Sequence, residues 1–300
     1  MLTIVQTALE AGFLYAPVAM ALFLSFSILN IADMTTDGAF VLGSAVSAMM
    51  CLSGHPILAL PAGMAAAALA GFITAFLQTK LAVPSILAGI VTNIGLYSIN
   101  LMVMGKSNQS LFQTDSIYTM AREAGFAGSW YRLAVTALIV LVLCALLVLF
   151  LGTRLGLSIR ATGDNADMVR ASSINPTFTV TVGLCISNSL TALSGAVVGQ
   201  AQKSADINGG TGIVVIGLAC LIIGETVVGR GSMRRGALAV IAGSVLYRFV
   251  YALVLRSPIP IDCLKLVTAI VVALAIAAPS LKQWWGFQCR RRAAAGKGGA

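Results

Sequence analysis

The chain has 300 residues, of which 58% are hydrophobic and only 10% are charged, and its formal net charge is +9. Soluble domains carry about a quarter charged residues, and a soluble chain this apolar would expose large hydrophobic patches. The composition therefore excludes an ordinary soluble protein. Continuous apolar runs of about 20 residues match the bilayer core and lack the alternation of a β-barrel. We predict an all-α polytopic membrane protein.

The positive charge and the cysteines narrow the function classes further. Basic loops that face the cytoplasm and anionic lipid account for the charge of a membrane protein, so we expect lipid contact and no nucleic-acid partner. The six cysteines are scattered and contain no C-x-x-C pair. This spacing indicates neither a metal site nor a disulfide framework.

Apolar stretches predict eight or nine transmembrane helices. In chain order the stretches are Ala11–Leu29, Ala39–Leu52, Pro56–Leu77, Val83–Met104, Leu133–Leu151, Phe178–Val198, Gly212–Gly224, Ala237–Leu255 and Leu264–Ala278. Small residues between Gly63 and Gly71 would let helices approach closely, within one subunit or between two. We expect one transmembrane domain at residues 1–281 and a basic, disordered cytoplasmic tail at 282–300.

The segment from Asn30 to Gly38 interrupts the first apolar region with two carboxylates, Asp33 and Asp37. A carboxylate at the bilayer centre costs about 2.5–3.5 kcal/mol on insertion scales, so such residues usually face a pathway or a partner. Thr35 beside them indicates a discontinuous helix near 30–38 whose backbone is satisfied locally. Two interpretations stay open: the carboxylates line or gate a solute path, or they cap the helix that follows.

Other polar side chains lie inside the predicted spans. Arg248 needs a partner there, and Asp33, Asp37 and Glu225 are the candidates for an ion pair. Amides such as those of Asn93 and Asn188 either join helices by hydrogen bonds or line a pore. The candidates for the path or its gate are Asp33, Thr35, Asp37, Asn93, Asn188, Glu225 and Arg248.

The polar stretch 157–176 separates two strongly apolar spans. Asp164 can cap a short helix that has Asp167 at its third position, and Asn175-Pro176 is typical of the start of the next helix. Met168 offers an apolar contact surface. We predict a short helix at 163–172, which either docks on a partner or rests on the lipid headgroups.

The distribution of basic residues predicts the orientation. If the C-terminal tail is cytoplasmic, alternation of the spans also places the loops around 78–80, 153–175 and 229–235 inside. That side then holds twelve of the nineteen cations: Lys80, Arg154, Arg160, Arg170, Arg230, Arg234, Arg235, Lys282, Arg290, Arg291, Arg292 and Lys297. This excess satisfies the positive-inside rule.

The sequence contains no recognisable nucleotide site. A P-loop needs a glycine five positions before Gly105 of Gly105-Lys106-Ser107, and Asn100 stands there. Nothing in the sequence groups a nucleophile with a base and an orienting residue. We therefore expect no enzymatic activity, and if ATP drives the protein, another polypeptide hydrolyses it.

Three segments resemble one family. Arg160-Ala-Thr-Gly-Asp-Asn-Ala-Asp-Met-Val-Arg-Ala-Ser-Ser-Ile-Asn175 looks like the coupling-helix segment of bacterial ABC importer permeases of the branched-chain amino acid and ribose type. Asn30–Gly43 is similar to the region after the first span of that family, and Gly224–Ser232 is similar to its glycine-rich loop. The sequence departs from the family at Ser173, where glycine is usual, and at Met168-Val169-Arg170.

The resemblance implies a permease subunit of an importer in the bacterial inner membrane, in the branch that is often assigned to amino acids, including aromatic ones. It implies a second permease copy, a cytoplasmic ATPase dimer that holds ATP and Mg²⁺, and an extracytoplasmic solute-binding protein, with no cofactor in this chain. It assigns the coupling role to Arg160, Gly163, Asp164, Asn165, Asp167, Met168 and Arg170.

Two other function classes stay open beside the importer. A secondary transporter or channel would work alone and use Asp33 and Asp37 for ion coupling. A membrane scaffold without transport would have unbroken spans free of buried charge, and Asp33, Asp37, Glu225 and Arg248 argue against it.

Overall fold

The computed structural model describes residues 2–125, 128–229 and 232–254, and the isolated residues 266, 269, 270, 273 and 277. The predicted span Leu264–Ala278 lies largely outside the described residues, and the tail 282–300 lies entirely outside them. The division into a transmembrane domain and a tail therefore stays a prediction.

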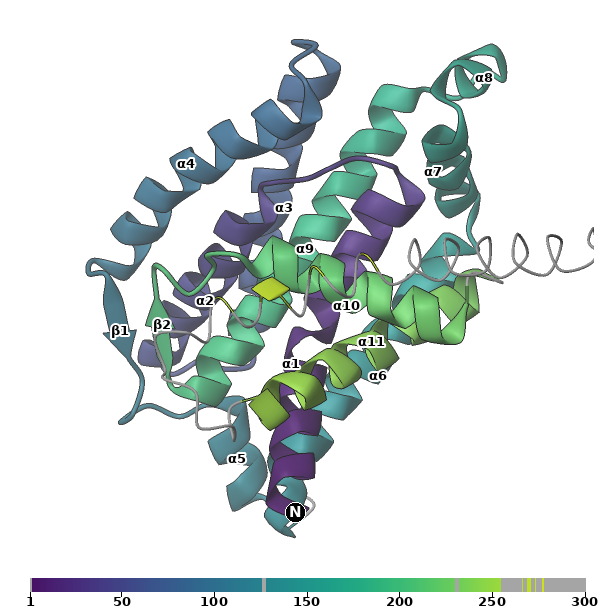
Figure 1. The fold of residues 1–300 in the computed structure, drawn as a ribbon. Helices are drawn as coiled ribbons and strands as arrows, with labels where there is room; N and C mark the ends of the chain where they lie inside the picture. The colour runs from purple at the N-terminus through teal and green to yellow at the C-terminus, as the bar shows by residue number, and fades with distance from the viewer. Residues whose placement is uncertain are drawn as a thin grey trace, which may run out of the picture.

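Helices make up most of the described chain, as the apolar runs predicted (Figure 1). In chain order they are α1 (Leu2–Leu22), the π-helix η1 (Phe23–Ile28), α2 (Thr36–Leu52), α3 (Ala59–Thr79), α4 (Ser85–Met104), α5 (Ile117–Glu123), the 3₁₀ turn η2 (Gly128–Trp130), α6 (Tyr131–Leu151), α7 (Arg154–Asp164), α8 (Ala166–Ala171), α9 (Pro176–Gln202), α10 (Ile213–Val228) and α11 (Met233–Val254). The fold class is that of an all-α polytopic membrane protein.

Six helices of the described part are long and apolar enough to cross a membrane. They cover Val5–Ile28, Ala59–Thr79, Ser85–Met104, Tyr131–Leu151, Pro176–Gln202 and Met233–Val254. Two shorter apolar helices, α2 and α10, accompany them. The total of eight or nine spans stays a prediction, because the last predicted span is largely undescribed.

Two polar connections meet at one end of the bundle. Strand β1 (Asn108–Ser110) pairs antiparallel with β2 (Ser204–Asp206), with Asn108 opposite Asp206. These strands belong to the connections 105–130 and 203–212, which follow α4 and α9. Figure 1 shows β1, β2, α5 and the N-terminus at this end, and α8 and the α3–α4 turn at the opposite end. The α3–α4 turn and α8 belong to two of the loops that were predicted inside, and they share one end.

Helix α9 occupies the centre of the bundle and packs against α1, α2 and α3. Small residues make this packing close: a Cβ at Gly71 of α3 would lie 2.7 Å from the carbonyl oxygen of Leu184 in α9. Close approach of the two backbones adds van der Waals contacts between the helices. These contacts matter in a membrane, because lipid tails are as apolar as the side chains and the hydrophobic effect does not drive helix association there. The glycine face predicted in α3 therefore packs within the subunit. Helices α4 and α6 are mostly exposed instead.

The predicted break after the first span is present. The π-helix η1 ends at Ile28, and Asn30 adopts a left-handed φ of 56°. An extended linker then runs to Thr36, where α2 begins. A π-helical turn commonly marks a site where regular helix geometry is relaxed for a functional or packing reason. Asp33 and Thr35 of this linker are buried in protein, whereas Asn30 at its start is exposed.

Candidate functional site

Asp33 is the centre of a buried hydrogen-bond network in the linker, and it is only 2% exposed. Its Oδ1 accepts from the backbone N–H of Thr35 at 2.9 Å, and its Oδ2 accepts from Nδ2 of Asn188 in α9 at 2.7 Å. The hydroxyl of Thr35 lies 2.8 Å from that of Thr74 in α3. Three of the predicted path residues thus come together, and they tie the linker to α3 and α9.

Asp37 forms a helix cap, although not for its own helix. Its Oδ2 accepts from the backbone N–H of Gly212 at 3.0 Å, and its Oδ1 accepts from that of Val214 at 2.9 Å. These amides open α10, whose N-cap residue Gly212 has no side chain to satisfy them. A carboxylate is favourable at this end because the helix dipole is positive there. The sequence predicted either a solute path or a cap for the helix that follows. Asp37 instead caps α10, whose N-cap residue Gly212 is 175 residues away, and α2 has no side-chain cap.

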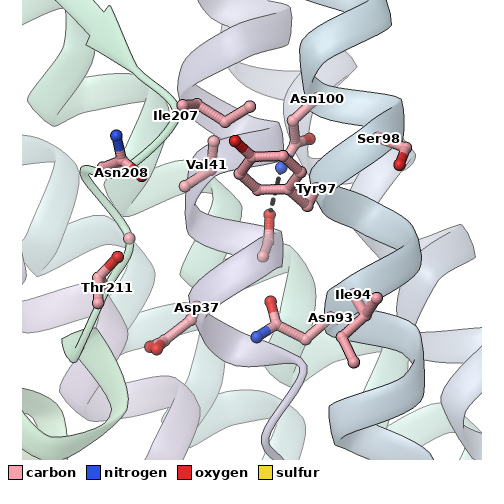
Figure 2. A pocket seen from close by; sticks show the side chains of 12 residues that line it. Asp37, Val41, Asn93, Ile94, Tyr97, Ser98, Asn100, Ile207, Asn208 and Thr211 are labelled. Atoms are coloured by element: carbon pink, nitrogen blue, oxygen red, sulfur yellow. Dashed lines mark hydrogen bonds between the residues drawn. The ribbon is translucent and has the colours of Figure 1, made fainter. Parts of the chain in front are cut away.

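Asp37 also lines a cavity of about 450 Å³ between α2, α4 and the loop 207–211 (Figure 2). Figure 2 shows the side chains of Asn93 and Tyr97 extending from α4 toward α2, with Asn208 and Thr211 on the opposite side. The polar residues that line it are Asp37, Asn93, Tyr97, Ser98, Asn100, Asn208 and Thr211. Val41, Ile94 and Ile207 contribute apolar walls. Asp37 and Asn93 are therefore the predicted path residues that share a cavity.

Sequence reasoning missed most of this lining. Asn93, Tyr97 and Asn100 follow one another at intervals of four and three residues, which places them on one face of a helix. That spacing was the available signal. Asn208 and Thr211 had no comparable signal, because the contact between their loop and α4 depends on the tertiary fold.

Glu225 and Arg160 line a second cavity, of about 270 Å³, between η1, α7, α10 and α11. The hydroxyl of Ser27 in η1 donates to Oε1 of Glu225 at 2.9 Å. A predicted path residue and a predicted coupling residue therefore share one cavity beside the π-helix, apart from the Asp33 network.

Arg248 has an aromatic partner. Its guanidinium carbon lies 3.7 Å from the ring centroid of Tyr15, which in turn stacks on Phe40. The expected ion pair with Asp33 or Asp37 is wrong, because within the described chain neither carboxylate forms a salt bridge with Arg248. A guanidinium over an aromatic face is stabilised by the ring quadrupole, and the buried Nε of Arg248 has no hydrogen-bond partner within the described residues.

The predicted coupling segment contains two helices instead of one. Helix α7 continues to Asp164, and the turn at Asn165 separates it from the six-residue α8. Oδ1 of Asn165 accepts from the backbone N–H groups of Asp167 and Met168, both at 3.0 Å. The predicted cap at Asp164 is therefore wrong: Asp164 is still helical, whereas Asn165 has the extended backbone that an N-cap requires. The helix is also shorter than the predicted 163–172.

Helix α8 exposes Met168, Asp167 and Arg170 on its surface, while the buried Val169 packs it against the protein. Met168 is 54% exposed, and Arg170 pairs with Asp167 at 3.5 Å on the surface. Val169 is only 1% exposed. Ser173, just after α8, has a left-handed φ of 61°, the conformation that glycine adopts most easily. Ser173 is one of the two places where the sequence departs from the pattern of the family that it resembles.

Helix α7 connects α8 to the rest of the bundle. The hydroxyls of Thr162 and Thr179 lie 2.8 Å apart and join α7 to α9. Gly163 lies so close to the carbonyl oxygen of Ile28 that a Cβ would overlap it. The start of α9 is as predicted, with Asn175 as N-cap and Pro176 at the first helical position. The coupling segment is thus anchored on η1 and α9.

Spanning helices, a partly buried linker, a polar cavity between helices and an exposed short helix at one end together define a membrane transport permease. Residues 4–279 match the family described as the permease component of the branched-chain amino acid transport system, so the chain belongs to that family. It is a permease component of an ABC transport system.

The third resembling segment, Gly224–Ser232, includes residues 230 and 231, which lie outside the described chain.

Two curated relatives cover most of the chain. A tyrosine transport system permease protein of Clostridioides difficile (strain R20291) is 33% identical over 264 residues, which are 88% of this chain and 87% of that protein. An uncharacterized protein of Rickettsia prowazekii (strain Madrid E) is 30% identical over 281 residues, 92% of this chain and 97% of that protein. A solved inward-facing ABC transporter covers 94% of this chain and 87% of that chain, at a TM-score of 0.49 and 18% identity, and adds nothing to the assignment.

Proposed function

We propose that this permease carries an amino acid with an aromatic or other apolar side chain into the cell. The observation that supports this substrate is the 33% identity with a tyrosine transport system permease over nearly the whole chain. The cavity beside Asp37 is compatible with it, because it combines amides, hydroxyls and a carboxylate with apolar walls. Pockets of this composition orient a small solute through a few polar groups.

Uptake in cells that contain this chain with its ATPase and binding protein tests the substrate. We expect ATP-dependent accumulation of labelled tyrosine, which unlabelled phenylalanine reduces and ribose leaves unchanged. Accumulation of ribose without any amino acid would overturn the proposal.

We propose further that a separate ATPase dimer binds ATP and Mg²⁺ and docks on α8, while this chain holds no nucleotide. Exposed Met168 beside the surface pair of Asp167 and Arg170 supports docking, since an apolar side chain rimmed by charges suits a protein contact. The other interpretation, a helix lying on lipid headgroups, predicts no such contact.

Co-purification tests the docking site. Met168→Glu buries a charge in the proposed contact, so the ATPase should no longer co-purify while the permease still inserts. The matched control is Met120→Glu, because Met120 is 41% exposed on α5 at the opposite end of the bundle. Intact assembly in Met168→Glu would contradict the coupling role.

We place α8 and the C-terminus on the cytoplasmic side of the inner membrane, because the basic loops predict that side and α8 shares its end with the α3–α4 turn (Figure 1). The solute-binding protein would then meet the opposite end, around β1 and β2, and a second copy of the chain would complete the path. Arg170→Cys should react with a membrane-impermeant thiol reagent only from inside, and Asn208→Cys only from outside. The reverse pattern would invert the orientation.

The competing class, a secondary transporter, has a direct test as well. Asp33 accepts two hydrogen bonds from groups that fix the linker, which favours a structural role over ion coupling. Uptake should therefore require the ATPase and persist when the proton and sodium gradients are collapsed. Uptake without the ATPase would support the secondary transporter.

A further inference from the structure

The cavity between α2, α4 and the loop 207–211 has an uneven charge. Among the described residues that line this cavity, Asp37 is acidic and none is basic. The other polar groups are neutral amides and hydroxyls. A carboxylate without a basic neighbour attracts a cationic group and repels an anionic one, while the N-terminus of α10 offsets part of its charge.

Asp37 can accept more hydrogen bonds than it receives. An ionised carboxylate has about four acceptor positions. The backbone N–H groups of Gly212 and Val214 donate one hydrogen bond to each oxygen, and that of Ile213 also faces the carboxylate, which leaves at least one acceptor position. The side chain is half-buried and lines the cavity, so the remaining positions can accept from a bound solute.

A second, independent feature of this cavity indicates a ligand. Asn100 lines it and is only 1% exposed; its Nδ2 donates to the carbonyl oxygen of Gly38 at 3.1 Å, as Figure 2 shows. Its Oδ1 has no hydrogen-bond partner in the part of the chain that is described. Buried polar atoms are nearly always satisfied in native proteins, so an unsatisfied oxygen at a cavity is an acceptor in need of a donor.

We propose that this cavity is a binding site for the solute on its way through the membrane, and that Asp37 holds the solute's ammonium group. The inference rests on the proposed amino-acid transport. It adds the place in the protein where the solute binds and the group of the solute that is recognised. The carboxylate end then faces the amides and hydroxyls of Asn93, Ser98 and Asn208, while Tyr97 and Ile94 contact an apolar side chain.

The same chemistry disfavours other solutes. A purely anionic solute would lack a basic partner among the described lining residues. A divalent metal ion would find one carboxylate, whereas hard cations take several charged or carbonyl oxygens. A primary ammonium with three donors fits the half-buried carboxylate of Asp37, which gives a selective site for zwitterionic or cationic amines.

Protection from alkylation tests the site in the full-length chain in lipid nanodiscs. Ser98→Cys introduces a thiol at an exposed position of the cavity wall, and peptide mass spectrometry reads alkylation at position 98 separately from the native cysteines. The probes are L-tyrosine, tyramine, which lacks the carboxylate, and 3-(4-hydroxyphenyl)propionate, which lacks the ammonium. We expect the first two to slow alkylation and the third to have no effect.

Two variants in the Ser98→Cys background locate the ammonium. Asp37→Asn should weaken protection by tyramine about tenfold or more, the value of a charge-assisted hydrogen bond. Asn208→Lys should weaken it comparably, because it adds a cation to the cavity while it leaves Asp37 on α10; Asn208 is exposed, so the fold tolerates the change. Asp115→Asn, an exposed carboxylate outside the cavity, is the matched control and should change nothing.

The outcomes separate this inference from the proposed function. Equal protection by tyramine and by the deaminated acid, or unchanged protection in both Asp37→Asn and Asn208→Lys, would overturn the role of Asp37 while amino-acid uptake stands. No protection by any probe, in a chain that supports tyrosine uptake, would overturn the cavity as the site. Failure of tyrosine uptake itself would overturn the proposed function instead.

Discussion

Gly163 in α7 lies directly against the backbone carbonyl oxygen of Ile28, the last residue of η1. The contact joins the segment proposed to meet the ATPase to the π-helix that leads into the linker with Asp33. A displacement of α7 toward η1 therefore cannot be absorbed by side-chain rotation at this point, because the glycine has no side chain. It must move the η1 backbone or be resisted by it.

Gly163→Ala should impair transport and stability together. The added Cβ overlaps the carbonyl oxygen of Ile28, so α7 and η1 must separate, and overpacking of this kind costs about 1–3 kcal/mol. We expect a lower thermal midpoint of the purified permease and lower uptake per folded molecule. The matched control is Gly95→Ala in α4, where no atom lies within 4 Å of the new Cβ. Wild-type stability and uptake in Gly163→Ala would show that α7 does not press on η1.

Ser173→Gly should stabilise the region of α8. A non-glycine residue in the left-handed region costs about 1–2 kcal/mol, and Ser173 has a φ of 61°. Glycine removes that cost but loses more conformational entropy on folding, so the net gain should be about 1 kcal/mol or less. Amide hydrogen exchange in α8 should slow accordingly.

The neighbouring Ser172 supplies the control for this change. It has an ordinary φ of −88°, and its hydroxyl donates to the carbonyl oxygen of Met168 at 3.1 Å. Ser172→Gly should therefore speed exchange in α8. If both glycine variants speed exchange, the left-handed backbone at Ser173 is not a source of strain.

Asn165→Ala should destabilise α8 without unfolding the bundle. Asn165 satisfies two backbone N–H groups at the start of α8, and removal of an N-cap side chain typically costs about 1 kcal/mol. We expect faster hydrogen exchange at Asp167 and Met168 and weaker co-purification of the ATPase. Asp164→Ala should have a much smaller effect, because Asp164 ends α7 and does not cap α8. The opposite ranking would restore the cap predicted from the sequence.

The sequence predicted what depends on local properties. Hydropathy located the six long apolar helices of the described chain to within six residues at either end, because burial in lipid requires a continuous apolar run. The pair Asn175-Pro176 located the start of α9, because both residues act on their own turn of helix. The predicted N-cap of α8, Asp164, was wrong although the signal is local. Either Asp164 or Asn165 can cap a helix, and Asn165 does so because α7 continues to Asp164.

Contacts between distant segments could not be predicted in the same way. Asp37 caps a helix whose N-cap residue, Gly212, lies 175 residues later, and Arg248 contacts Tyr15, to which no spacing rule connects it. A carboxylate in a membrane span indicates that it needs partners, but it does not say which ones. The predicted list of path residues was therefore divided among the Asp33 network, the Asp37 cavity, the Glu225 cavity and the Arg248 stack.

Single variants at Asp33, followed by an exchange of the side chains at Asp33 and Asn188, test whether the Asp33 network is structural. The first variant, Asp33→Ala, leaves the backbone N–H of Thr35 without its acceptor and removes one acceptor of Asn188. Loss of buried partners costs about 1–3 kcal/mol each, so we expect a clearly lower thermal midpoint as well as lower uptake. Asp33→Asn keeps an oxygen for Thr35 but turns an amide toward the amide of Asn188.

The double variant Asp33→Asn with Asn188→Asp restores a donor opposite an acceptor. It should regain most of the stability that Asp33→Asn loses, and the double-mutant cycle should give a coupling energy of about 1 kcal/mol or more. Uptake should recover with stability, because the carboxylate need only stay between the linker and α9. If stability recovers while uptake does not, a carboxylate at position 33 itself is required for transport, and the network is more than a structural tie.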